Sequence, residues 1–198
     1  EFSDQILQSS ASFQAKFLGK QYIAVYARLA VFQMQEDGNE LIQQMAMHIV
    51  NHTRHLMQRM PMSKIFLASD IFSPMLDHER KLSATLAGQM RWPKSKVNRF
   101  MSKNSAAMQF AKQQLLGLKA VQFRLPPNAD TTHAVVMDQQ LCLASKVLVS
   151  TIYGSFALQL RFDRASQDLP LWQCSESGCV QSNTTIEPSA RPMLSRHQ

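Results

Sequence analysis

Two short stretches of the chain carry groups that could bind a phosphate. In the first, an apolar run ends at Tyr26 and is followed by Arg28, whose guanidinium could pair bidentately with a diphosphate. In the second, Gly154, Ser155 and Phe156 separate an apolar run from a helical pattern. Backbone N–H groups at a helix start favour phosphate, and a glycine lets the backbone approach closely. Together the two stretches predict a site for a phosphate-bearing nucleotide.

The elements that must position these stretches alternate between strands and helices. Periodicity predicts helices at 3–18, 39–60, 104–116, 135–145 and 155–162, and strands at 22–26, 64–68, 120–123 and 147–150. Because each strand is short and apolar throughout, helices should cover both faces of the sheet. The sequence therefore predicts an α/β fold over residues 1–165, a Rossmann-like parallel sheet with helices on both faces. Residues 166–198 are polar and lack periodicity, which predicts an extended C-terminal tail.

Ligands of such sheets bind beyond the carboxyl ends of the strands. By that rule the informative positions are residues 26–28, Ser69, Asp70, Arg124 and residues 151–156. They lie far apart in the sequence, yet the fold would place them along one edge. We expect Asp70 to cap the segment near Ser73 rather than to bind a ligand.

The ordered set of segments resembles the GDP-fucose protein O-fucosyltransferase family over residues 2–172. The matching segments are YIAVYAR at 22–28, IFLASD at 65–70, and the block 138–164, in which an aspartate leads a helix and a Gly-Ser-Phe turn follows the next strand. The resemblance implies that the chain supplies the C-terminal, nucleotide-binding half of a two-domain GT-B glycosyltransferase. It implies GDP-fucose as donor substrate, no further cofactor, and transfer of fucose to a Ser or Thr hydroxyl of a protein acceptor.

The resemblance also implies roles for individual residues. Arg28 would be catalytic, stabilising the charge that develops on the diphosphate as the sugar leaves. Asp138 would accept hydrogen bonds from the guanine N1–H and 2-amino groups, while Gly154, Ser155 and Phe156 would hold the phosphates. Ordinary structural roles remain open beside these. They are a surface salt bridge for Arg28, an acidic residue stabilised near a helix start for Asp138, and a capped helix with Phe156 in the core.

Four parts of the sequence depart from the family pattern. One is the run Leu-Ala-Val-Phe-Gln after Arg28, which has neither the small polar nor the acidic residue often seen there. The family's histidine is replaced by Tyr26, whose hydroxyl could restore part of a polar contact near the nucleotide. The threonine of Ala-Thr-Asp is Ser69, and the first serine of the turn is Gly154. These departures leave a second hypothesis open, namely a catalytically degenerate member that serves as a binding or structural subunit of a larger assembly.

The net charge of +7 is unevenly distributed. From Arg80 to Ala129 there is no Asp or Glu, while ten Lys and Arg residues occur. Such a surface attracts anionic partners. Charge alone supports a third hypothesis of nucleic-acid binding, and without an aromatic-interleaved recognition motif we do not expect a nucleic-acid partner.

Cysteine usage favours an oxidising compartment. Cys174 and Cys179 could close a small disulfide loop, whereas Cys142 lies in an apolar helical pattern and is expected to be a buried free thiol. The pair and the glycosylation sequon at Asn183 favour the secretory pathway, in the endoplasmic reticulum or Golgi lumen. No apolar run approaches the roughly 20 residues of a membrane span.

Three histidines share a spacing that could bind a metal ion. His48, His52 and His55 fall on one face of a predicted helix, at a spacing that can hold zinc. No carboxylate or cysteine from another element joins them in the sequence pattern. We therefore expect a solvated histidine face and no metal site.

Overall fold

The computed structural model describes residues 4–35, 37–61, 63–72, 106–123 and 131–182 of the chain. No helix in these ranges is both long and apolar enough to cross a membrane. In chain order the elements are α1 (Asp4–Phe13), η1 (Gln14–Leu18), β1 (Tyr22–Ala27), η2 (Ala30–Met34), α2 (Gly38–Arg59), β2 (Lys64–Ser69), α5 (Ala106–Leu116), α6 (Thr131–Leu143), β3 (Val147–Thr151), α7 (Ser155–Ser166), β4 (Leu171–Ser175) and β5 (Gly178–Gln181).

The strands form one mostly parallel sheet in the order β2-β1-β3-β4-β5. β1 is parallel to β2 and β3, β3 is parallel to β4, and β5 alone runs antiparallel. The strand predicted at 120–123 is reduced to a single bridge, in which Val121 pairs parallel with Phe66 of β2. From Val121 through β2 to β1 the chain order runs backwards, and from β1 through β3 to β4 it runs forwards. The order thus reverses between β1 and β3.

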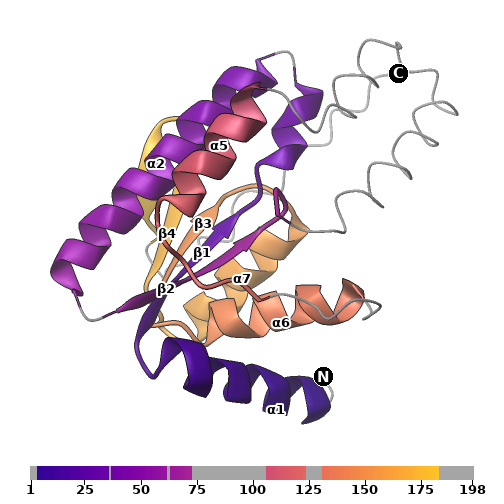
Figure 1. Cartoon of the computed structure of the whole chain (residues 1–198), viewed down its shortest axis with the longest axis vertical. Coiled ribbons are helices and arrows are strands. Elements are labelled where there is room, and N and C mark those ends of the chain that lie inside the picture. Colours follow the sequence, from indigo (N-terminus) through magenta and orange to yellow (C-terminus); the bar gives the residue numbers. More distant parts are fainter. Residues whose placement is uncertain (1–3, 36, 62, 73–105, 124–130, 183–198) are drawn as a thin grey trace, which may run out of the picture.

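Helices cover both faces of this sheet. Because successive side chains of a strand point to opposite sides, each strand contributes to a core on either face. Ile23, Val25 and Ala27 of β1 join the core beneath α2 and α5. Tyr22 and Ala24 join a second core with residues of α6 and α7. Figure 1 shows α2 and α5 on one side of the sheet and α1, α6 and α7 on the other. The predicted α/β class and the helices on both faces are confirmed.

The sheet continues past the predicted boundary at residue 165. β4 pairs with β3 in parallel register, and β5 folds back on β4 as a hairpin. The prediction of an extended tail is therefore wrong for residues 171–181, and residues 183–198 lie outside the described ranges. The apolar signal of β4 is weak because only Leu171 and Cys174 of its side chains are buried, and Trp172 and Gln173 between them are half-buried.

The cysteine predictions are confirmed. Cys174 and Cys179 face each other across the β4–β5 hairpin and form a disulfide with an S–S distance of 2.00 Å. Cys142, on α6, is a free and fully buried thiol. Burial raises the pKa of the Cys142 thiol well above its ordinary value, so this group stays protonated and unreactive.

A buried arginine, to which sequence analysis gave no role, joins α7 to the end of α6. Arg164 is 0% exposed. Its Nη1 donates to the carbonyl oxygens of Cys142 and Ser145 at 3.0 and 3.1 Å, and its Nη2 donates to that of Pro170 at 2.8 Å. Burial lowers the pKa of Arg164 to about 10, so it remains a cation at neutral pH. It thereby satisfies carbonyl groups that the C-terminus of α6 leaves without helical partners.

Candidate functional site

The carboxyl ends of β1 and β3 meet where the strand order reverses. Arg28 follows β1 directly, and its backbone N–H donates to Oγ1 of Thr151, the fully buried last residue of β3, at 3.3 Å. In open α/β sheets the crevice at such a reversal is where ligands bind. The topology thus places the predicted residues of both stretches at the expected position.

The side chain of Arg28 lies against Gly154. A β-carbon built on Gly154 would stand 3.3 Å from Cδ, 3.6 Å from Nη1 and 3.7 Å from Nε of Arg28. Gly154 also has a φ of 97°, which side-chain-bearing residues rarely adopt. The predicted proximity of the Arg28 guanidinium to this turn is therefore confirmed, and the glycine makes it possible.

The N-terminus of α7 adds backbone donors to the same turn. The carbonyl of Gly154 accepts from the N–H of Leu158 at 3.1 Å, which begins the helical hydrogen bonds. The N–H groups of Ser155, Phe156 and Ala157 come before this bond and have no acceptor within the helix. Gly154 and Ser155 at this turn are exposed, whereas Phe156 is half-buried and Ala157 is buried. An anion bound here would meet a cation and the positive end of a helix dipole together.

Tyr26 contacts both Arg28 and the N-terminal turn of α7, which together form what we call the Arg28–Gly154 corner. Its ring lies against that of Phe156, with centroids 4.7 Å apart and planes tilted by 30°. Burial raises the pKa of Tyr26 well above its ordinary value, and the charge of Arg28 and a hydrogen bond from it only partly oppose this. Tyr26 is thus a neutral phenol whose hydroxyl is a partner of the guanidinium.

Asp70 holds the backbone after Arg28. Its two carboxylate oxygens accept from the N–H groups of Leu29 and Ala30 at 2.9 and 3.0 Å. Asp70 thus caps the start of η2, a role that the prediction of a cap near Ser73 missed; Ser73 lies outside the described residues, as does Arg124. The neighbouring Ser69 hydroxyl donates to the carbonyl of Ala27 at 2.8 Å. The end of β2 therefore fixes the segment that carries Arg28.

Asp138 lies in the middle of α6 rather than at the start of a helix. The prediction that Asp138 leads a helix is therefore wrong, and so is its interpretation as a residue stabilised near a helix start. The carboxylate is half-buried, and among the described residues no donor is hydrogen-bonded to it. Burial raises its pKa to about 7. The adjacent Met137 belongs to the same core as Tyr26 and Phe156, so α6 covers the face of the sheet on which these rings lie.

The three histidines of α2 do not form a uniformly solvated face. The His52 ring packs against Trp172 of β4, with centroids 4.1 Å apart, and its Nε2 is buried without a hydrogen-bond partner. Burial lowers the pKa of His52, which keeps the ring neutral. Within the described ranges, no group of three or more His, Cys, Asp or Glu is arranged to hold a metal ion.

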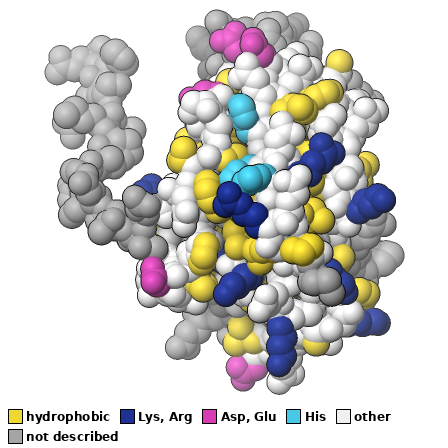
Figure 2. Space-filling view, turned by 90° about the vertical axis from the view of Figure 1, so that its left-hand side faces the viewer, with side chains coloured by type: hydrophobic (Ala, Val, Ile, Leu, Met, Phe, Trp, Pro, Cys, Tyr) yellow, Lys and Arg dark blue, Asp and Glu magenta, His cyan; other side chains and the backbone are white. Residues whose placement is uncertain are grey.

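Basic side chains form no continuous stripe on the face shown in Figure 2. Lys and Arg side chains there are scattered among apolar and uncharged ones, and His side chains lie in the upper middle of the view. Of the ten basic residues in the acid-free run, only Lys112 and Lys119 fall within the described part of the chain. The expectation about a nucleic-acid partner therefore stays a prediction.

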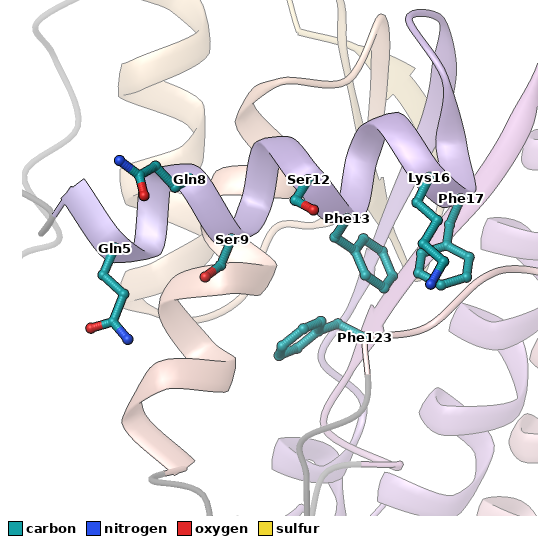
Figure 3. Close-up of a pocket in the computed structure, with 8 residues that line it drawn as sticks. All are labelled: Gln5, Gln8, Ser9, Ser12, Phe13, Lys16, Phe17 and Phe123. Atoms are coloured by element: carbon teal, nitrogen blue, oxygen red, sulfur yellow. The ribbon is translucent and has the colours of Figure 1, made fainter.

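An open groove of about 500 Å³ lies along α1 (Figure 3). The rings of Phe13 and Phe123 stand edge to face within it, with centroids 5.4 Å apart, and Lys16 is the only charged side chain of its lining. The groove shares no residue with the Arg28–Gly154 corner. Its lining residues are Gln5, Gln8, Ser9, Ser12, Phe13, Lys16, Phe17 and Phe123.

Comparison with known proteins gives structural neighbours only. No family model and no curated protein sequence matches the chain. Among solved structures, the apo form of POFUT1 is similar with a TM-score of 0.48 at 13% identity, over 86% of this chain and 46% of that one. POFUT1 in complex with GDP-fucose is similar with a TM-score of 0.44 at 13% identity, over 82% and 43% respectively. The chain thus spans less than half the length of these neighbours, and the likeness concerns the arrangement of strands and helices alone.

Proposed function

We propose that this domain binds the diphosphate of a guanosine diphosphate sugar, GDP-fucose, at the corner between β1 and β3. One observation carries the proposal, the contact between the Arg28 side chain and Gly154 at the N-terminus of α7. It brings a guanidinium and the first N–H groups of a helix to one solvent-facing position. Both groups favour phosphate oxygens, and they come from segments that only the fold brings together.

The chemistry of this corner suits fucosyl transfer. As the bond between the sugar and the β-phosphate breaks, negative charge builds up on the diphosphate, and Arg28 with the α7 amides would stabilise it. The fucose would pass to a Ser or Thr hydroxyl of a protein acceptor with inversion at the sugar carbon. Rate enhancement would come from this stabilisation and from positioning. The acceptor would be held by a further domain or by a partner subunit.

Asp138 supports guanine as the base of the donor. In the described part of the chain no group donates a hydrogen bond to this half-buried carboxylate, and burial raises its pKa. Such a group is costly to bury unless a donor, for example from a ligand, pairs with it. The N1–H and 2-amino groups of guanine are two adjacent donors that one carboxylate accepts together, and adenine has no such pair. We propose this role for Asp138 as the resemblance implies it, although Asp138 lies in the middle of α6 and not at its start.

A second candidate function is supported by Tyr26. Its phenol already hydrogen-bonds to Arg28 and stacks on Phe156, where the family pattern has a histidine. A diphosphate must therefore share or displace this partner. If it cannot, the domain is a binding or structural subunit that has kept the fold without donor binding.

The disulfide supports a secretory location. Cys174 and Cys179 are joined in the structure, and such bonds persist in oxidising compartments. We therefore propose the lumen of the endoplasmic reticulum or Golgi as the site of action.

Calorimetric titration with GDP and with ADP tests the donor proposal. We expect the wild-type protein to bind GDP more tightly than ADP. If only the Tyr26→His variant binds GDP, the second candidate is correct for the natural chain. If neither protein binds GDP, the donor site is rejected.

A further inference from the structure

A tyrosine next to the Arg28–Gly154 corner is held by contacts on two sides. Tyr153 immediately precedes Gly154, and its hydroxyl donates to Oε2 of Glu176 at 2.6 Å. Its ring also stands edge to face with the buried ring of Phe32, with centroids 4.8 Å apart and planes at 84°. The residue before the glycine is thus fixed to η2 and to the β4–β5 hairpin.

Glu176 itself sits on a restrained loop. It lies between Cys174 and Cys179, which the disulfide joins covalently. Its backbone carbonyl is 3.2 Å from Nε2 of His48 on α2, close enough to accept a hydrogen bond. The carboxylate that receives the Tyr153 hydroxyl is therefore carried by a loop whose ends are covalently tied.

The same hairpin also pairs with β3, whose last residue accepts a hydrogen bond from the backbone of Arg28. Cys174 pairs in register with Thr151, and its carbonyl accepts from the N–H of Ile152 at 3.3 Å. Thr151 in turn accepts from the backbone N–H of Arg28. The hairpin therefore supports both sides of the corner, the Arg28 backbone through Thr151 and the turn of Gly154 through Tyr153.

We propose that Tyr153 and Glu176 are positioning residues, whose hydrogen bond ties the disulfide-closed hairpin to the turn before α7 and so fixes the α7 amides relative to Arg28. This inference rests on the proposed function only for the identity of the anion. Neither residue is required to touch the ligand. Their contact sets the geometry in which the guanidinium and the amides act together.

The contact persists at neutral pH. The pKa of Tyr153 is raised to about 12, by burial first and then by its hydrogen bond to Glu176, so the phenol keeps its proton. The pKa of Glu176 is lowered because it accepts from Tyr153, so the carboxylate stays ionised. Since Glu176 is exposed, loss of this bond should loosen the turn without unfolding the domain.

Four single variants and one double variant test the inference by GDP calorimetry. Tyr153→Phe keeps the ring against Phe32 but removes the donor, and Glu176→Ala removes the acceptor; each should weaken GDP binding about fivefold. Glu176→Gln keeps an acceptor oxygen and should restore affinity to within about twofold of wild type. Val180→Thr, at an exposed position of the same hairpin, is the matched control and should leave affinity unchanged. Combining Tyr153→Phe with Glu176→Ala should cost no more than either change alone.

A second readout separates this inference from the donor proposal. In the protein without nucleotide, the amides of residues 154–158 should exchange hydrogen faster in Tyr153→Phe and Glu176→Ala than in wild type and Val180→Thr. If wild type fails to bind GDP, the donor proposal fails, and these exchange rates still decide the positioning role. Unchanged exchange in both variants would overturn it, as would unchanged affinity in a protein that binds GDP.

Discussion

The side chain of Arg28 lies where a side chain of residue 154 would begin, and Gly154 has none. Arg28 follows β1 and Gly154 precedes α7, so the two residues are far apart in the sequence. The contact depends on an arginine at position 28 and a glycine at position 154. A β-carbon at position 154 would stand only 3.3 Å from Arg28 Cδ, and an uncharged side chain at position 28 would remove the cation that lies beside the N-terminus of α7. The candidate anion site therefore depends on how the fold brings Arg28 to Gly154.

Replacement of the glycine tests this contact. Gly154→Ala introduces a β-carbon 3.3 Å from Arg28 Cδ at a φ of 97°, and it should weaken GDP binding about tenfold. Gly19→Ala is the matched control, because Gly19 also has a positive φ, of 80°, with nothing within 4 Å of its β-carbon. Both variants should lose about 1–3 kcal/mol in urea unfolding from backbone strain. Equal GDP affinity in the two variants would contradict the role of the contact.

Stability should depend on pH through Asp138. Its carboxyl has an ordinary pKa of 3.8 and a folded pKa of about 7, so between these values the folded protein holds a proton that the unfolded chain releases. The free energy of unfolding should therefore fall as the pH rises through this window. Asp138→Asn removes the titrating group. The free energy of unfolding of Asp138→Asn minus that of wild type should therefore be about 2 kcal/mol larger at pH 8 than at pH 5. Parallel urea-unfolding profiles of the two proteins against pH would show that the carboxyl titrates normally.

The preference for GDP over ADP should depend on the same titration of Asp138. It should rise with pH, whereas the free energy of unfolding falls. An ionised Asp138 accepts both guanine donors, so GDP affinity should rise between pH 6 and pH 8. ADP carries the same phosphates and corrects for their own titration. In Asp138→Asn the preference for GDP over ADP should largely disappear and no longer change with pH. A pH-independent preference in wild type would assign guanine recognition to other residues.

Arg164 should be essential for stability. Arg164→Met keeps an apolar stem but removes the donors to Cys142, Ser145 and Pro170, and it should cost about 3–5 kcal/mol because buried carbonyls lose their partners. Arg161→Met, one turn earlier on α7 and half-buried, is the control and should change stability by about 0.5 kcal/mol or less. The free energy of unfolding in urea measures both. A small loss in Arg164→Met would mean that water replaces the guanidinium.

The strands that form the centre of the sheet were predictable because their signals are local. The apolar runs of β1, β2 and β3, together with Gly19 and Pro61 as breakers, fixed the strand and helix positions to within a few residues. β4 was missed because it buries only Leu171 and Cys174. Its stability comes from pairing with β3 on one side and from the disulfide hairpin on the other, which no local pattern reveals.

The site was predictable only where the strand-end rule applies. That rule brought Arg28 to Gly154 from the sequence alone. It could not reveal that Asp70 caps η2 or that Arg164 satisfies the end of α6, because both partners are set by tertiary packing. Asp138 was misplaced because α6 begins at Thr131, earlier than the periodicity indicated. The Tyr153–Glu176 contact joins residues of different elements, and only the fold brings them together.

The most direct test is calorimetric titration of GDP into wild type, Arg28→Lys and Arg28→Ala. We expect one GDP per wild-type chain, weaker binding to Arg28→Lys because a lysine keeps the charge but loses the bidentate fork, and a loss of at least about tenfold in Arg28→Ala. Unfolding midpoints equal to that of wild type would show that the variants are folded. GDP bound as tightly by Arg28→Ala as by wild type would contradict the anion site at the β1–β3 corner.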